Sequence, residues 1–97
     1  MNVFAIGSII KPLTDEQRKA IMPREVPATL QHYLDGKIEQ FWSCQDAPGV
    51  IFLMNVDSAG QAKAELDALP LVVGGFAKYD LIPVGPLKPL GSLIQSK

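Results

Sequence analysis

Apolar residues concentrate in four short segments of this chain, separated by more polar, turn-forming segments. Each apolar segment is rich in Val, Ile, Leu or Phe and has the length of a strand rather than a helix. The predicted strands are residues 3–10, 38–44, 50–56 and 76–84. Apolar side chains fall on both faces of most of them, which predicts that both faces of the sheet are covered.

The first predicted helix begins with the capping-box sequence Thr14-Asp15-Glu16-Gln17. The Thr14 hydroxyl can accept a hydrogen bond from the Gln17 amide, and the Gln17 side chain can reach back. Pro23 and Pro27 each remove an amide donor, so we expect a helix to about residue 22, a kink, and a second stretch to about residue 34. The expected apolar stripe consists of Val26, Leu30 and either Tyr33 or Leu34.

The second predicted helix begins with another capping box, Ser58-Ala59-Gly60-Gln61. Its expected apolar face consists of Ala62, Leu66 and Leu69. We expect Pro70 to end this helix. Gly36, which follows the first helix, is expected to be its left-handed C-cap.

The resulting order, βαββαβ, predicts an α+β fold of the ferredoxin-like type, with two helices on one face of a four-stranded antiparallel sheet. Because the strands do not alternate cleanly, we expect a second copy of the sheet to cover the other face and form a dimeric α+β barrel. The predicted domain is residues 1–84. Residues 85–97 are apolar but interrupted by prolines, and we expect this tail to pack on a partner subunit; the alternative is a loosely packed terminus.

Composition favours a small protein that associates with itself. The chain has 97 residues, 47% of them hydrophobic, which is enough for one domain with some apolar surface left for another subunit. We therefore expect a homo-oligomer, a dimer or a ring of dimers. The formal net charge of −1, with acids and bases interspersed, argues against a nucleic-acid partner.

The single cysteine, Cys44, excludes an internal disulfide and a zinc site built from cysteines. Charged residues interrupt the apolar runs before they reach the length of a membrane span, so no membrane association is expected. The first residues, Met1-Asn2-Val3-Phe4, lack the basic start of a signal peptide. These features predict a cytoplasmic protein.

The second predicted strand has an unusual mixture of side chains and contains the only tryptophan. Strict alternation over residues 38–43 would place Trp42 with the even-numbered residues on one face and Glu39 with the odd-numbered residues on the other. Each face would then be mixed, as expected where a sheet borders a cavity.

Four short sequences stand out along the chain: Arg24-Glu25 in the first helix, Gly36-Lys37 before the second strand, Trp42 on that strand, and Leu69-Pro70-Leu71 after the second helix. With their matching spacing over about residues 13–83, the chain resembles muconolactone isomerase and its relatives in the dimeric α+β barrel superfamily. The chain departs from the family at Glu39-Gln40, where the family has an Arg-His pair.

The resemblance implies a proton-shift isomerase that acts on a small carboxylated lactone and uses no metal or organic cofactor. Such a reaction needs a base, a site that excludes water, and a cation or amide donor for the substrate. Glu39 is the preferred base, because an acid facing an apolar cavity would be tuned for proton transfer. Glu25 is the second candidate. The alternatives are an edge-strand acid in water for Glu39 and a surface acid paired with Arg24 or a neighbouring lysine for Glu25.

Other candidates would bind the substrate. Arg24 and Lys37 are possible carboxylate anchors, and the alternative for each is a solvated surface charge. The remaining candidates are Trp42 and Tyr79 as cavity walls, Gln40 as a cavity polar group, and His32 as a base or as the haem ligand of a haem-degrading relative. For the aromatic residues the alternative is ordinary packing, and for His32 it is a favourable position at a helix end.

Two functions of other classes stay open. One is a cofactor-free oxygenase of the same superfamily, which would favour an aromatic-lined pocket; the chain has few aromatic residues. The other is a non-enzymatic ligand-binding or assembly module, which would lack convergent polar groups.

Overall fold

The computed structural model describes residues 1–85 and has the predicted βαββαβ order, with one additional short helix. Its elements are β1 (Asn2–Ile9), α1 (Asp15–Leu34), β2 (Ile38–Ser43), β3 (Gly49–Asn55), α2 (Ala59–Asp67), α3 (Pro70–Val73) and β4 (Ala77–Val84). The predicted strands are therefore confirmed to within about a residue. The expected tail on a partner subunit concerns residues 86–97, which lie outside the described residues.

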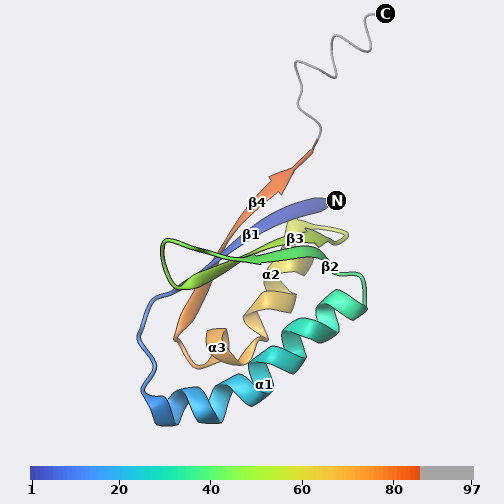
Figure 1. Ribbon diagram of the computed structural model, residues 1–97. Coiled ribbons are helices and arrows are strands. Elements are labelled where there is room, and N and C mark those ends of the chain that lie inside the picture. Colours follow the sequence, from blue (N-terminus) through green and yellow to red (C-terminus); the bar gives the residue numbers. More distant parts are fainter. Residues whose placement is uncertain (86–97) are drawn as a thin grey trace, which may run out of the picture.

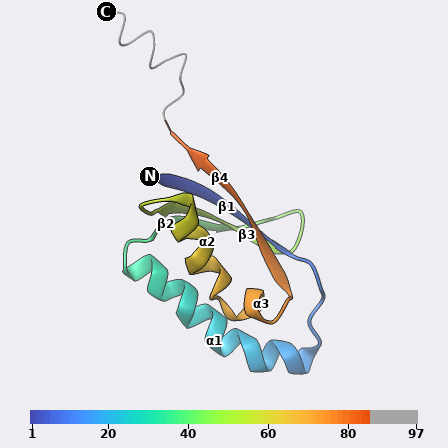
Figure 2. The ribbon, with the colours of Figure 1, turned by 180° about the vertical axis from the view of Figure 1, so that it is seen from behind.

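The four strands form one antiparallel sheet in the order β2-β3-β1-β4, as the ferredoxin-like arrangement requires. Within residues 1–85, all three helices lie on the same face of this sheet, and Figures 1 and 2 show the opposite face without a helix. The predicted fold class is confirmed. The dimer stays a prediction.

Helix α1 starts as the sequence predicts: the Thr14 hydroxyl accepts from the Gln17 amide, and the Gln17 side chain accepts from the Thr14 amide. The expected division at the prolines is wrong, because one helix runs from Asp15 to Leu34. Pro23 and Pro27 leave the carbonyls of residues 19 and 23 without helical donors. Lys19 and both prolines are exposed, so water can reach these carbonyls and the helix continues.

The expected apolar stripe of α1 is also wrong. All of its members are exposed: Val26, Leu30, Tyr33 and Leu34. The buried residues of α1 are instead Ile21 and Glu25, and Ala28 packs against the main core. The helix is therefore rotated so that a carboxylate, rather than the larger apolar residues, faces the interior.

The main core lies between α2 and the sheet. It joins the alternating inward residues of β1 and β3 to the apolar face of α2, where Ala62, Leu66 and Leu69 are almost fully buried as predicted. On β1 the inward residues are Val3 and Ala5. This packing covers only part of the helix-facing side of the sheet and leaves the part under α1 for the cavity described below.

Helix α3 is absent from the sequence prediction, which assigns to Pro70 only the end of α2. The structure places Pro70 at the first position of the new helix. Proline is favoured there because its missing amide would have no helical partner and its φ is already suitable. The following turn reverses at Gly75, which has a φ of 80°, as does Gly36 after α1.

The other face of the sheet carries many apolar side chains. By strand alternation it presents Phe4 and Ile6 of β1, Ile51 and Leu53 of β3, Trp42 of β2 and Ile82 of β4. Trp42 is 46% exposed and Ile82 is 48% exposed. We call these six residues the open apolar face.

Candidate functional site

A cavity of about 880 Å³ lies between α1 and the helix-facing side of the sheet. Its walls come from α1, from all four strands, and from the segments that precede α1 and β3. This volume is within the range of protein sites for small molecules. Its lining is mostly apolar, with a few polar side chains, chiefly Arg18, Glu25, Thr29 and Tyr79.

Glu25 is the acid of this cavity and is only 6% exposed. One carboxylate oxygen, Oε1, accepts from the Leu71 amide at 2.9 Å, and the other, Oε2, accepts from the Thr29 hydroxyl at 3.2 Å. A buried carboxylate is costly unless such donors compensate for lost water. The two donors fix the carboxylate and leave each oxygen with capacity for a further hydrogen bond.

Tyr79 forms the opposite wall, on β4. Its ring stacks on Phe52 with the centroids 5.6 Å apart, and it lies over Gly7 of the neighbouring strand. Burial, and secondly the charge of Glu25, raise the pKa of Tyr79 above its ordinary value. Tyr79 is therefore a neutral hydroxyl at physiological pH, able to donate a hydrogen bond in the cavity that contains Glu25.

Arg18 is the only cation among the cavity-lining residues that the structure describes. It lies on the same side of α1 as Met22, Glu25 and Thr29, at helical spacing. Unlike Glu25, Arg18 is exposed. No acid within residues 1–85 forms an ion pair with it.

The predicted position of Glu39 in a cavity is wrong. A β-bulge between Ile38 and Gln40 adds one residue to β2, so strict alternation fails there. Glu39 is exposed and accepts from the Asn2 side chain at 3.2 Å. Gln40, which is also exposed and pairs with Leu53, does not line the cavity.

Trp42 borders the cavity at the edge of the sheet, but its ring belongs to the open apolar face. The ring centroid is 6.4 Å from that of Phe4. Phe41 of β2 lines the cavity as well; it pairs with Phe52 and contacts Tyr33 of α1 with the ring centroids 5.0 Å apart.

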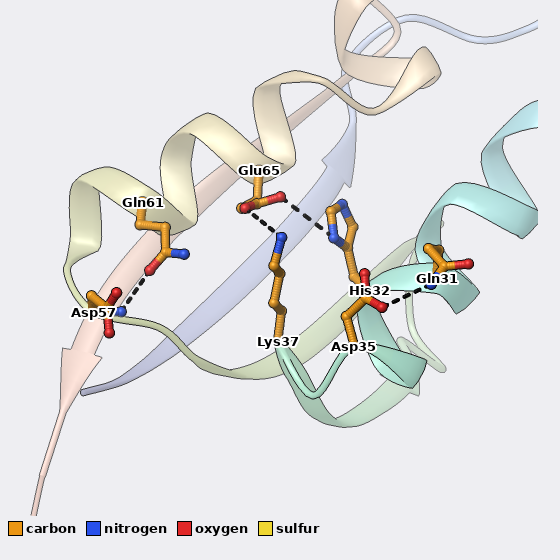
Figure 3. Close-up of polar contacts among 7 residues, drawn as sticks. All are labelled: Gln31, His32, Asp35, Lys37, Asp57, Gln61 and Glu65. Atoms are coloured by element: carbon orange, nitrogen blue, oxygen red, sulfur yellow. Dashed lines mark hydrogen bonds and ion pairs between the residues drawn. The ribbon is translucent and has the colours of Figure 1, made fainter.

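The two expected carboxylate anchors lie elsewhere. Arg24 is exposed and is not part of the cavity lining. Lys37 pairs with Glu65 of α2, with Nζ and Oε1 2.8 Å apart, and Nδ1 of His32 lies 3.5 Å from Oε2 of the same carboxylate. Figure 3 shows this cluster bridging the end of α1 and α2. The hydrogen bond to Glu65 raises the pKa of Lys37.

Arg18, Thr29, Phe41 and Gly7 are among the site residues that sequence reasoning missed. Arg18, Met22, Glu25 and Thr29 do recur at helical spacing, which was the available signal. The predicted apolar stripe of the same helix was a stronger signal, but it indicated the wrong face, because its residues are exposed. Gly7 gave no signal, because its role depends on the pairing of β1 with β4.

Two further features bear on the kind of site. No cluster of three or more histidine, cysteine or acidic side chains within residues 1–85 could hold a metal ion. In the same part of the chain, no helix combines the length and apolar character needed to cross a membrane.

Comparison with known proteins identifies a fold but not a family. No protein-family model matches the chain, and no curated protein matches it. It is similar to the solved structure of 5-chloro-2-hydroxyhydroquinone dehydrochlorinase (TftG) from Burkholderia phenoliruptrix, in complex with 2,5-dihydroxybenzoquinone. The TM-score is 0.66 at 14% identity, over 90% of this chain and 97% of that chain. The likeness supports the fold that the resemblance implied, and leaves membership of the isomerase family as a proposal.

Proposed function

We propose that this protein is an enzyme that moves a proton on a small carbon acid, as a muconolactone isomerase-like protein would. The observation that carries the proposal is Glu25, a buried acid fixed by two donors on the wall of a mostly apolar cavity. An acid in this setting can act as a general base, because the cavity limits competition from water.

In the proposed reaction, Glu25 accepts a proton from a carbon next to a carbonyl group. The electron pair of the broken C–H bond moves into the enolate, and the Tyr79 hydroxyl donates a hydrogen bond to the enolate oxygen. Glu25 then returns the proton to a second carbon, which shifts the double bond. The reaction is balanced within one substrate molecule, since one proton leaves and one returns, and the acid formed on Glu25 can exchange its proton with solvent between the two steps.

Matched glutamine variants test the base. Glu25→Gln keeps an oxygen that can accept from the Leu71 amide but removes the basic carboxylate. We expect proton exchange on carboxylated unsaturated lactones in D2O, followed by NMR, to fall by about 10²- to 10⁴-fold. Glu39→Gln, on the exposed side of β2, should leave the rate unchanged. Equal rates for the native protein and a folded Glu25→Gln variant would remove Glu25 from the role.

The neighbouring structure gives a second candidate, a dehydrochlorination in which a base accepts a proton as chloride ion leaves. The dehydrochlorination is tested by measuring chloride release from 5-chloro-2-hydroxyhydroquinone, the compound that appears in the name of the neighbouring protein. If the native chain binds small organic molecules in the cavity but catalyses neither reaction, a ligand-binding module is favoured instead.

We also propose that the open apolar face pairs with the same face of a second copy, giving a homodimer. Phe4, Ile6 and their neighbours form an apolar surface that crosses all four strands, whereas isolated domains seldom expose such continuous patches. A twofold pair would cover this surface on both copies at once.

A further inference from the structure

Among the cavity-lining residues that the structure describes, one is an acid and one is a cation, and the two do not form an ion pair. Glu25 is fixed by Leu71 and Thr29 and is almost fully buried. Arg18, on the same helix, is exposed and has no acidic partner within residues 1–85. The two charges therefore mark an inner and an outer end of the same cavity.

The distance between these ends suits one small molecule. Arg18 and Glu25 are seven positions apart on α1, so their Cα atoms are separated by about 10 Å along the helix axis. Met22 and Val26 form an apolar wall in this part of the helix. A ligand spanning the cavity would place an apolar body against this wall and a polar group at each end.

We propose that Arg18 binds a carboxylate of the ligand at the outer end of the cavity. A guanidinium can hold a carboxylate through two parallel hydrogen bonds, and an arginine without an acidic partner keeps its donors available. This assigns to Arg18 the anchoring role that the sequence suggested for Arg24 and Lys37. The substrate class is then a small organic acid whose reactive carbon lies away from its carboxylate, toward Glu25.

The inference rests on the proposed role of the cavity as a ligand site, but not on Glu25 acting as a base. A binding experiment therefore separates the two. Phenylacetate and phenylacetamide are suitable probes, because they share an apolar body and differ chiefly in the negative charge. Their dissociation constants can be measured by NMR titration of the 97-residue chain.

Three variants complete the test: Arg18→Met, Arg18→Lys and the matched control Arg24→Met. Arg24 has the same charge, lies on the same helix and is likewise exposed, but it is not part of the cavity lining. We expect Arg18→Met to weaken phenylacetate binding by about five- to tenfold and phenylacetamide binding by less than about twofold. Arg18→Lys should weaken phenylacetate binding by less, and Arg24→Met should not weaken it.

Three results would overturn the proposal: unchanged phenylacetate binding in Arg18→Met, an equal loss in Arg24→Met, or no saturable binding of either probe to the native protein. The result for Glu25 is independent. If Glu25→Gln keeps full activity but Arg18→Met loses carboxylate selectivity, the proposed base fails and the role of Arg18 stands.

Discussion

The Tyr79 ring lies directly over Gly7, its partner in the pairing of β1 with β4. A Cβ atom at Gly7 would be 2.5 Å from Cε1 of Tyr79, closer than packed atoms allow. The absence of a side chain on β1 thus lets the ring cross the strand and form a wall of the cavity. The position of the Tyr79 phenol therefore depends on Gly7 of β1 as well as on β4.

Gly7→Ala should therefore displace the Tyr79 ring. We expect the free energy of unfolding to fall by about 1–3 kcal/mol, the usual range for overpacking, and phenylacetate binding to weaken. Urea denaturation and NMR titration measure these effects. Gly60→Ala is the control, since Gly60 lies in α2, where the added Cβ would be 3.7 Å from Oγ of Ser58, an ordinary contact distance. It should leave stability unchanged or slightly higher, and a Gly7→Ala variant of native stability would contradict the steric explanation.

The raised pKa of Tyr79 predicts a loss of stability at alkaline pH. The folded protein holds the phenolic proton more tightly than the unfolded chain, whose tyrosine pKa is about 10. The stabilisation is fully present below about pH 10 and is lost as pH rises through the folded-state pKa. Denaturation between pH 8 and 11 should show a steeper decline for the native protein than for Tyr79→Phe. Identical pH profiles would mean that the hydroxyl is not shielded from water.

Ile82→Asp should prevent the proposed dimer. Ile82 pairs with Phe4 on the open apolar face, and an aspartate there would place an unpaired charge in the contact between two sheets. Sedimentation velocity should show a dimer for the native protein and a monomer for the variant. Val73→Asp is the control, because Val73 is 72% exposed on α3 and belongs to the other side of the molecule. A monomeric native protein at high concentration would refute the dimer.

Lys37 should prove to be a stabilising residue rather than a ligand contact. Its ammonium group pairs with Glu65, and Lys37→Gln should lower the melting temperature but leave phenylacetate binding unchanged. Glu65→Gln should lower the melting temperature as well, and the double variant should lose less than the sum of the two. Weaker phenylacetate binding in Lys37→Gln would show that Lys37 contributes to carboxylate binding, contrary to this prediction.

The fold could be predicted from the sequence because its signals are local. The capping box at Thr14, the Ser58 N-cap and the apolar strand segments each depend on residues that are close together in the chain. The second capping box is only half formed, because the Gln61 side chain accepts from the Asp57 amide rather than from Ser58. These local signals fixed the element order, and that order leaves few ways to arrange a single sheet. Pro70 was misinterpreted because proline both ends one helix and begins another, and the sequence alone does not distinguish the two cases.

The candidate site was harder to predict because its positions depend on contacts between distant segments. One extra residue in β2 moved Glu39 away from the expected cavity, and bulges of this kind leave little trace in hydrophobicity. Glu25 was a candidate, but its buried carboxylate accepts a hydrogen bond from the Leu71 amide, 46 residues away in sequence. A contact between such distant residues cannot be read from the local pattern. Helix α1 packs against α3 and β2, and its own apolar pattern did not reveal these contacts.

Strand β2 gives the cavity and the proposed subunit contact a common wall. Phe41 and Trp42 are consecutive residues, yet the first lines the cavity and the second belongs to the open apolar face. A ligand that shifts this edge strand acts on both sides of the sheet. In the proposed dimer, ligand affinity and subunit affinity would be thermodynamically linked, so the apparent dissociation constant of a ligand would depend on protein concentration.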